Sequence, residues 1–126
     1  MDAQRTVLVV EDNNFVRTQI VVFLKGAGYN TLEATDGNEA LALLSEEVSL
    51  VIVDVRMEPM GGFDFIGMMQ MEDYKIPVVL VTGDQDSDLL ERANKLGVAS
   101  VLMKPVQKDR LVSIVSRLIE RGRQTR

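Results

Sequence analysis

The hydrophobic residues of this chain follow two different spacings. Largely apolar runs rich in Val, Leu and Ile are typical of strands that are covered on both faces of a sheet. These runs lie at 7–10, 50–53, 77–81 and 99–103. A more polar run at 30–33 suits a short strand at the edge of the sheet. The pattern therefore predicts five strands.

Each strand is followed by a segment with the period of an amphipathic helix. In the first segment Val16, Ile20 and Leu24 share a helix face, and glycines at 26 and 28 end it. The second segment has a helix start at 36–39 followed by the apolar run 40–44. The other three faces comprise Phe65, Ile66 and Met69; Leu89, Leu90, Ala93 and Leu96; and Leu111, Ile114, Val115, Leu118 and Ile119. Alternating strands and helices without a linker or repeat predict a (βα)₅ fold of the α/β class, with a doubly wound parallel sheet.

Composition restricts the chemistry of this chain. It contains no cysteine and no histidine, which excludes disulfides, thiolate metal sites and the usual general base. With 14 basic and 19 acidic residues its formal charge is −5, so we expect no direct nucleic-acid binding. No apolar stretch approaches the roughly 20 residues of a membrane span, and the N-terminus lacks a signal-peptide layout. We expect a soluble, cytoplasmic protein that has no membrane contact.

Polar residues follow directly after four of the predicted strands. Glu11 and Asp12 follow the first strand, Asp54 the third, Thr82 the fourth and Lys104 the fifth. Each residue alone has a structural explanation, because such carboxylates often cap helices and such threonines and lysines often belong to turns or the surface. In an open parallel sheet, however, ligands bind beyond the carboxyl ends of the strands. These residues would meet there.

Three carboxylates at one edge of a sheet repel one another and need positive charge nearby. Mg²⁺ meets this need because it favours carboxylate, carbonyl and water oxygens, and the ammonium of Lys104 would add a second positive charge. Such a site suits phosphoryl transfer, in which cations neutralise phosphoryl oxygens and a carboxylate attacks to give an acyl phosphate. The residues therefore predict Mg²⁺-dependent phosphoryl transfer.

The chain resembles the receiver domains of two-component response regulators, in particular the single-domain chemotaxis-type members, from Thr6 to about Gly122. The matching segments are V-L-V-V-E-D at 7–12, A-T-D-G-N-E-A-L at 34–41, D-V-R-M at 54–57, G-G at 61–62, P-V-V-L-V-T-G at 77–83 and K-P at 104–105. The resemblance implies one receiver domain over residues 1–126, with a flavodoxin-like sheet in the strand order 2-1-3-4-5. It also implies a signalling switch, not an enzyme, whose chemistry is limited to self-phosphorylation and autodephosphorylation.

The resemblance assigns roles to the acidic residues. Asp54 would accept the phosphoryl group from a histidine kinase or a histidine phosphotransfer protein. Mg²⁺ would be held by Asp12 and Asp54, by the backbone carbonyl of Arg56 and, largely through water, by Glu11. The modified chain would then act by changing its binding to a downstream protein target, which the sequence does not identify.

The remaining site residues would bind the phosphoryl group or transmit its presence. By resemblance, Lys104 would pair with the phosphoryl group, Thr82 would donate a hydrogen bond to it, and Gly83 would keep access open. Pro105 would follow a cis peptide bond. Members of this family commonly carry Tyr or Phe three positions before the lysine, where this chain has Val101. We therefore expect the aromatic part of the switch to be missing.

Three further positions depart from the family pattern or tune the site. The family places a proline directly after the methionine, whereas here Glu58 separates Met57 from Pro59, so the loop path and its charge should differ. Arg56 and Asp84 lie two positions beyond the acceptor and two beyond the threonine. In this family such side chains flank the path of the hydrolytic water, so we expect both to tune the phosphoryl lifetime.

Two other classes of protein fit these residues less well. A haloacid-dehalogenase-type hydrolase needs a second carboxylate two positions after the nucleophile, and that position is Arg56. A dinucleotide-binding fold lacks support because no G-x-G-x-x-G follows the first strand. The remaining alternative is a pseudo-receiver, an interaction module that keeps the fold without phosphorylation. The complete set of acceptor-site residues favours phosphorylation.

Five of the seven methionines fall around the third predicted helix. They are Met57, Met60, Met68, Met69 and Met71. Methionine fills irregular gaps in cores, and it also forms adaptable docking surfaces. The pattern favours core filling and leaves a Met-rich docking surface as the alternative.

Overall fold

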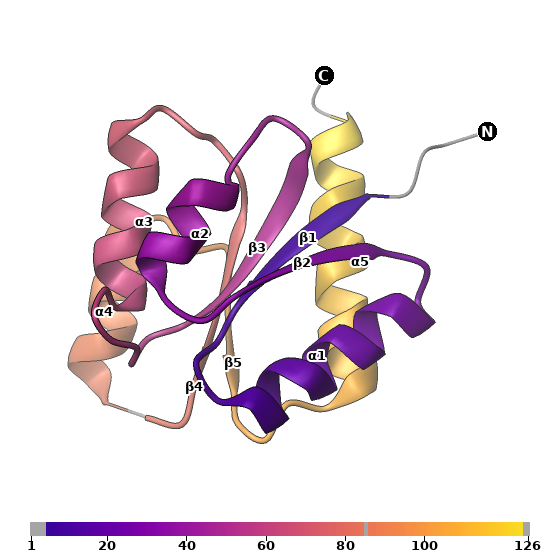
Figure 1. Ribbon diagram of the computed structural model, residues 1–126, viewed down its shortest axis with the longest axis horizontal. Coiled ribbons are helices and arrows are strands. Elements are labelled where there is room, and N and C mark those ends of the chain that lie inside the picture. Colours follow the sequence, from indigo (N-terminus) through magenta and orange to yellow (C-terminus); the bar gives the residue numbers. More distant parts are fainter. Residues whose placement is uncertain (1–4, 85, 125–126) are drawn as a thin grey trace.

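Five parallel strands form one sheet in the order β2-β1-β3-β4-β5 (Figure 1). The computed structural model describes residues 5–84 and 86–124, so the predicted domain bounds at residues 1 and 126 lie outside the described residues. The strands are β1 (Thr6–Val10), β2 (Asn30–Ala34), β3 (Val48–Asp54), β4 (Val78–Thr82) and β5 (Ser100–Met103). The helices are α1 (Asn14–Gly26), α2 (Gly37–Leu43), α3 (Gly62–Met71), α4 (Ser87–Lys95) and α5 (Lys108–Gln124). The predicted α/β fold and its strand order are confirmed.

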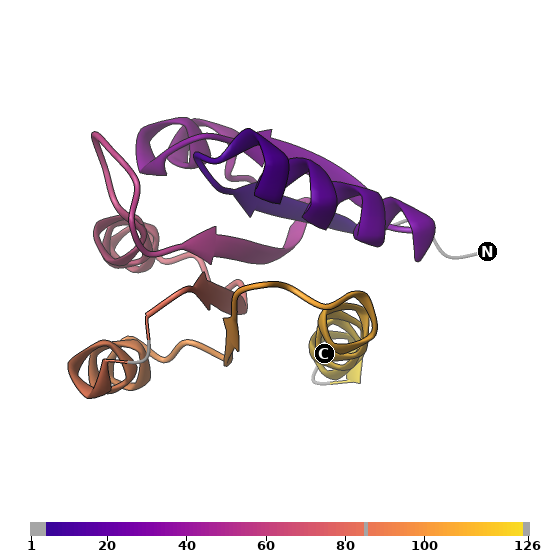
Figure 2. The same ribbon diagram turned by 90° about the horizontal axis from the view of Figure 1, so that it is seen from below.

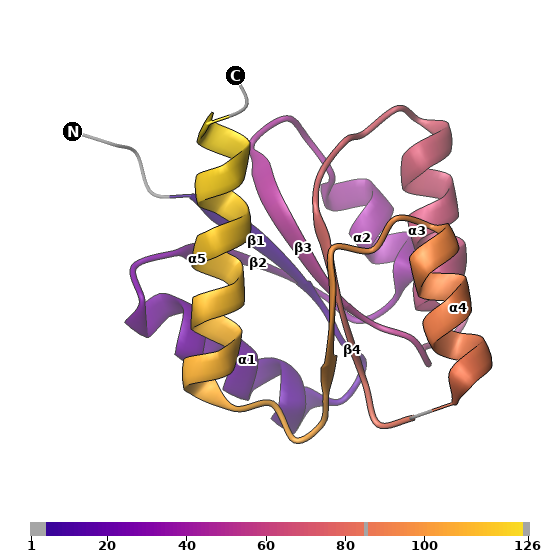
Figure 3. The same ribbon diagram turned by 180° about the vertical axis from the view of Figure 1, so that it is seen from behind.

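The helices cover both faces of the sheet. Helices α1 and α5 lie on one face, and α2, α3 and α4 lie on the other (Figures 2 and 3). Along β1, Val7 and Val9 enter the core beneath α1 and α5, whereas Leu8 and Val10 enter the core beneath α2 to α4. A strand buried on both faces is apolar at every position, which explains the continuous runs in the sequence.

The register of the strands brings the predicted site residues to one edge of the sheet. Val10 pairs with Val53, so Glu11 follows next to Asp54. On the other side Thr82 pairs with Met103, and the backbone N–H of Lys104 donates to the carbonyl of Thr82 at 2.9 Å. The loops that follow β1, β4 and β5 lie at the bottom of Figure 1.

Some details differ from the predicted pattern. Leu90 is exposed, because the buried face of α4 consists of Leu89 and Ala93 at a spacing of four, and Leu90 lies about 100° further around the helix. Strand β3 begins at Val48, two residues before the apolar run. Among the described residues, no helix combines the length and apolar character that a membrane crossing requires.

Candidate functional site

Three carboxylates converge beyond the carboxyl ends of β1 and β3. One oxygen each of Glu11, Asp12 and Asp54 lies within 4.8 Å of the others. Glu11 is 1% exposed and Asp54 is 7% exposed, whereas Asp12 is open to solvent. The cap of α1 is Asn13, whose Oδ1 accepts from the N–H of Val16 at 3.0 Å. The acidic pair after β1 therefore does not serve as the helix cap, and its structural explanation is wrong.

The Glu11 carboxylate is buried between a backbone donor and a lysine. Its Oε2 accepts from the N–H of Asn13 at 3.1 Å, and its Oε1 lies 3.0 Å from Nζ of Lys104. Burial raises the pKa of Glu11 to about 7, although the hydrogen bond from Asn13 and the nearby ammonium of Lys104 lower it. The charged form of Glu11 is therefore poorly stabilised by protein groups alone.

Lys104 bridges the two buried carboxylates. Its Nζ lies 3.0 Å from Oε1 of Glu11 and donates to Oδ2 of Asp54 at 3.2 Å. Burial alone would lower the pKa of Lys104, but the adjacent carboxylates of Glu11 and Asp54 outweigh it and raise this pKa. One ammonium faces three carboxylates, so the ionised cluster carries excess negative charge. This donor set fits a hard divalent cation such as Mg²⁺.

The residues after β4 place a hydroxyl and an ion pair next to this cluster. Thr82 is 2% exposed, and its Oγ1 accepts from the N–H of Asp84 at 3.0 Å. A Cβ built on Gly83 would meet no atom within 4 Å, so this position faces open space. The side chain of Asp84 forms an ion pair with Arg56, which joins the loop after β4 to the loop after β3.

The other predicted site residues flank the cluster. The peptide bond between Lys104 and Pro105 is cis, as the resemblance implies, and so is the bond between Glu58 and Pro59. Val101 is half-buried and packs against the core beneath α2 to α4. The role of the Arg56 backbone carbonyl as a metal ligand remains a prediction.

Two residues that support the site were not identified from the sequence. Gly62 lies so close to the end of β3 that a Cβ there would collide with the backbone carbonyl of Asp54. Its N–H donates to the carbonyl of Val55 at 2.9 Å. Although Gly62 belongs to the matching G-G segment, its contact with the end of β3 appears only in three dimensions.

Arg17 is the second supporting residue. It donates to the backbone carbonyl of Glu11 at 2.8 Å, to Oε1 of Glu33 at 3.0 Å and to Oδ1 of Asn14 at 2.6 Å. These three bonds hold the loop that carries the acidic pair against α1 and the end of β2. A single arginine in a helix carries no sequence signal for such a role.

The methionines divide between the two interpretations. Met57 and Met69 are buried and Met60 is partly buried, as core filling predicts. Met68 and Met71 are exposed, Met71 to 82%. Core filling therefore explains only part of the group.

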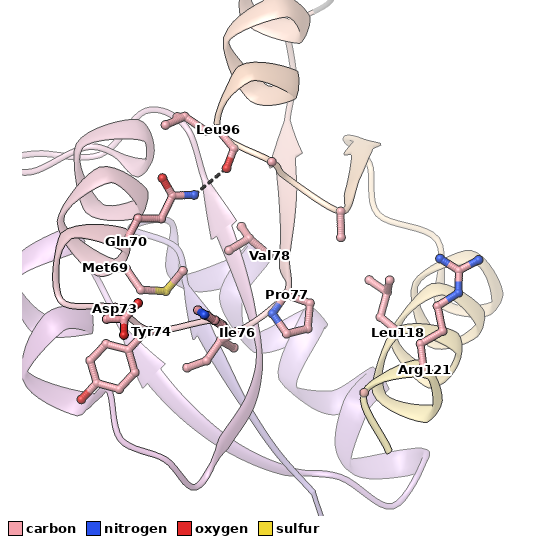
Figure 4. A pocket seen from close by; sticks show the side chains of 14 residues that line it. Met69, Gln70, Asp73, Tyr74, Ile76, Pro77, Val78, Leu96, Leu118 and Arg121 are labelled. Atoms are coloured by element: carbon pink, nitrogen blue, oxygen red, sulfur yellow. Dashed lines mark hydrogen bonds between the residues drawn. The ribbon is translucent and has the colours of Figure 1, made fainter. Parts of the chain in front are cut away.

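A pocket of about 580 Å³ lies at the opposite end of the sheet (Figure 4). Tyr74 and Pro77 line it from the connection between α3 and β4, and Leu118 and Arg121 line it from α5. It lies before the start of β4, whereas the acidic cluster lies beyond the carboxyl ends of the strands. It is therefore separate from the candidate site.

Comparison with known proteins gives one consistent result. The family model of the response regulator receiver domain matches residues 7–116. The CAI-1 autoinducer sensor kinase/phosphatase CqsS of Vibrio cholerae is 30% identical over 117 residues, which cover 90% of this chain and 17% of CqsS. The chain spans between 17% and 28% of the length of the first curated relatives that it matches.

Solved structures agree with the sequence comparison. A response regulator receiver protein from Pseudomonas putida has a TM-score of 0.86 at 31% identity, covering 93% of this chain and 99% of that chain. The chemotaxis protein CheY4 of Vibrio cholerae has a TM-score of 0.86 at 28% identity, covering 92% of this chain and 99% of that chain. Together with the match over residues 7–116, this agreement shows that the chain belongs to the response regulator receiver domain family, the signalling switches of two-component systems.

Proposed function

We propose that Asp54 accepts a phosphoryl group from a phosphohistidine of a histidine kinase or a histidine phosphotransfer protein. The observation that carries this proposal is the buried Asp54 carboxylate, 3.2 Å from the ammonium of Lys104 and clustered with Glu11 and Asp12. A carboxylate oxygen of Asp54 would form the new P–O bond as the P–N bond breaks. The imidazole would leave with the bonding electron pair and take up a proton, and the product would be an acyl phosphate.

The acidic residues would hold Mg²⁺ during this transfer. Asp12 and Asp54 would be its direct carboxylate ligands, the carbonyl of Arg56 would complete the protein ligands, and Glu11 would act largely through bound water. When bound, Mg²⁺ would neutralise phosphoryl oxygens as charge develops on them. Without added positive charge, the three carboxylates would repel an anionic donor, since Lys104 balances only one of them.

Thr82 and Lys104 would hold the phosphoryl group after transfer. Because Oγ1 of Thr82 already accepts a hydrogen bond from the N–H of Asp84, its own hydroxyl hydrogen is available for an acceptor. A phosphoryl oxygen on Asp54 would be such an acceptor. Lys104 would exchange part of its contact with Asp54 for a pairing with the phosphoryl group, and Gly83 leaves the approach open.

The proposed partners are proteins. Relatives carry the matching segment in a sensor kinase/phosphatase and in a transcriptional regulatory protein, ZraR of Salmonella typhimurium. We propose a phosphohistidine donor and a downstream protein target for this chain, in the cytoplasm, where such donors act. Phosphorylation would change the affinity for the target.

Intact-mass spectrometry tests this function directly. Incubation with acetyl phosphate and Mg²⁺ should add one phosphoryl group to the wild-type chain, and Asp54→Asn or chelation of Mg²⁺ should abolish the addition. Asp64→Asn removes an exposed carboxylate from α3 and should leave labelling unchanged. Equal labelling of Asp54→Asn would refute the acceptor assignment. A folded wild-type chain that takes up no phosphoryl group from acetyl phosphate or from cognate kinases would instead be a pseudo-receiver.

A further inference from the structure

Acidic residues are concentrated on one part of the molecule. Residues 26–74, which contain β2, α2, β3 and α3, carry ten acidic side chains and a single basic one, Arg56. Arg56 is itself paired with Asp84. Neither α2 nor α3 contains a lysine or an arginine. Glu39 on α2 and Asp64 on α3 are both exposed, so these two helices present negative charge that a positively charged partner would neutralise.

An apolar groove of about 610 Å³ lies on this acidic surface. Met60, Phe63, Met68 and Met71 contribute its apolar lining, and Asp64 lies on its margin. Met71 is 82% exposed and Met68 is 38% exposed. Solvent-exposed apolar groups gathered in one hollow with polar margins are typical of interaction sites. We refer to this feature as the α2–α3 groove.

The fixed part of the groove is built by the start of α2 and the loop before α3. The N–H of Gly37 donates to the carbonyl of Met60 at 3.0 Å, and a Cβ on Gly37 would lie 2.6 Å from Cγ of Met60. The guanidinium of Arg92 on α4 lies 4.3 Å from the centroid of the Phe63 ring, so one cation contacts this lining residue. Met68 and Met71 are exposed, lie three residues apart on α3 and line the same groove. Helices α2 and α3 lie side by side in Figure 1.

We propose that the α2–α3 groove binds a basic amphipathic helix of a partner protein. A helix places apolar anchors every three or four residues, which suits a hollow lined along one helix by Met68 and Met71. Methionine side chains are unbranched and polarisable, so they adapt to the anchors of such a helix. Lysine and arginine on the flanks of the partner helix would face the acidic margin, where complementary charge speeds association and rejects acidic helices.

A second copy of this chain is a poorer occupant. Its most basic helix is α5, with Arg110, Arg117 and Arg121, but the apolar face of α5 is already buried against the sheet through residues such as Leu111 and Val115. Helix α5 of a second copy would therefore supply positive charge but no free apolar side chains to fill the groove. A contact between α5 of one copy and the groove of another would also be head-to-tail, and such contacts close only at particular rotations.

The proposal is tested with a synthetic helix and methyl-labelled protein. The probe is an amphipathic Leu/Lys peptide with leucines at i, i+3, i+4 and i+7, and the control peptide has glutamate in place of lysine. With the methionine methyl groups labelled with ¹³C, the Leu/Lys peptide should shift the signals of Met60, Met68 and Met71 and leave that of Met103 on β5 in place. The Leu/Glu peptide should not bind.

Matched variants separate apolar docking from general attraction to an acidic protein. The double variant Met68→Gln/Met71→Gln keeps the charge of the protein. It should lower the affinity for the Leu/Lys peptide by about tenfold or more in titration calorimetry. Val22→Gln removes a side chain on α1 that is 60% exposed and should leave the affinity unchanged. Circular dichroism checks that the variants are folded, which is expected because all three side chains are exposed.

Several results would overturn the proposal. Equal weakening by Val22→Gln, unchanged affinity in Met68→Gln/Met71→Gln, or equal binding of the Leu/Glu peptide would each show that the groove does not recognise a basic amphipathic helix. Self-association in sedimentation velocity that is lost in Met68→Gln/Met71→Gln would assign the groove to a second copy instead.

Discussion

The side chains of Arg56 and Asp84 form an ion pair that connects the loop after β3 to the loop after β4. Arg56 is 79% exposed and Asp84 is 37% exposed, so the pair is open to solvent. Such pairs contribute only about 0.2–1 kcal/mol to stability. Because this contribution is small, we expect the ion pair to matter mainly for function. A substitution of either residue frees the side chain of the other from the pair.

This pair should govern the phosphoryl lifetime as a unit. Arg56→Ala and Asp84→Ala should each change the rate of autodephosphorylation more than the rate of phosphoryl uptake. The double variant should show less than the product of the two single effects, because either substitution already breaks the pair. Phosphate release after removal of the donor measures the rates, with Arg117→Ala on α5 as a control. Equal release rates in all these proteins would contradict this prediction.

The buried Glu11 carboxyl predicts a pH dependence of metal-free stability. Its pKa is about 7 in the folded chain against an ordinary value of 4.5, so the folded state binds this proton more tightly than the unfolded state. The resulting stabilisation is complete below pH 4.5 and is lost as the pH rises through 7. Glu11→Gln removes the titration and should raise the free energy of unfolding at pH 8 by about 1–3 kcal/mol, with a smaller gain at pH 5.

Urea unfolding in the presence of a chelator measures this difference at the two pH values. With excess Mg²⁺ the wild-type chain should gain more stability than Glu11→Gln, because the variant has lost a charged group near the metal. A gain from Glu11→Gln that is the same at pH 5 and pH 8 would show that the carboxyl does not titrate in this range.

Gly62 and Gly67 lie on the same helix and offer a matched pair of substitutions. A Cβ on Gly62 would collide with the carbonyl of Asp54, whereas a Cβ on Gly67 would meet nothing within 4 Å. Gly62→Ala should lower the free energy of unfolding by about 1–3 kcal/mol and slow phosphoryl uptake, since it displaces the acceptor strand. Gly67→Ala should be neutral or stabilising by up to about 1 kcal/mol, as expected inside a helix. Similar losses in both variants would attribute the effect to helix geometry alone.

Features that follow from the residue pattern along the chain were predicted from the sequence, whereas side-chain contacts between separate elements were not. Runs such as Val7 to Val10 predicted strands buried on both faces, and in an open parallel sheet the polar residues that follow such strands must meet at one edge. The positions of Glu11, Asp54 and Lys104 follow from that rule. The supporting roles of Arg17 and Gly62 were not predicted, because their contacts with Glu11 and Asp54 join separate elements.

The methionine pattern shows a second limit of the same kind. Residues 68, 69 and 71 are identical in type and adjacent in sequence, yet Met69 is 1% exposed and Met71 is 82% exposed. The helical spacing correctly placed Met69 with Phe65 and Ile66 on the buried face, but the methionine count alone did not show that Met68 and Met71 are exposed. Met69 belongs to the core cluster that contains strand residues such as Val51 and Val78, so packing against the sheet decides which side of α3 is buried.

Signal transmission should depend on Thr82 more than on Val101. Val101 is half-buried against the core beneath α2 to α4, and a β-branched side chain has few rotamers and little reach, so it cannot move as an aromatic ring would. The preference of the phosphorylated chain for its signalling conformation must then come mainly from the Thr82 hydroxyl and the Lys104 charge.

Beryllofluoride, a phosphoryl mimic, tests this prediction. It should shift the backbone amide signals of α4 and β5 in the wild type and in Thr82→Ser, which keeps the hydroxyl. Thr82→Ala should lose most of this response. Val101→Ala should keep it while lowering the free energy of unfolding by about 1 kcal/mol through lost burial. If Val101→Ala abolishes the response and Thr82→Ala retains it, the signal leaves the site through Val101 and not through the hydroxyl.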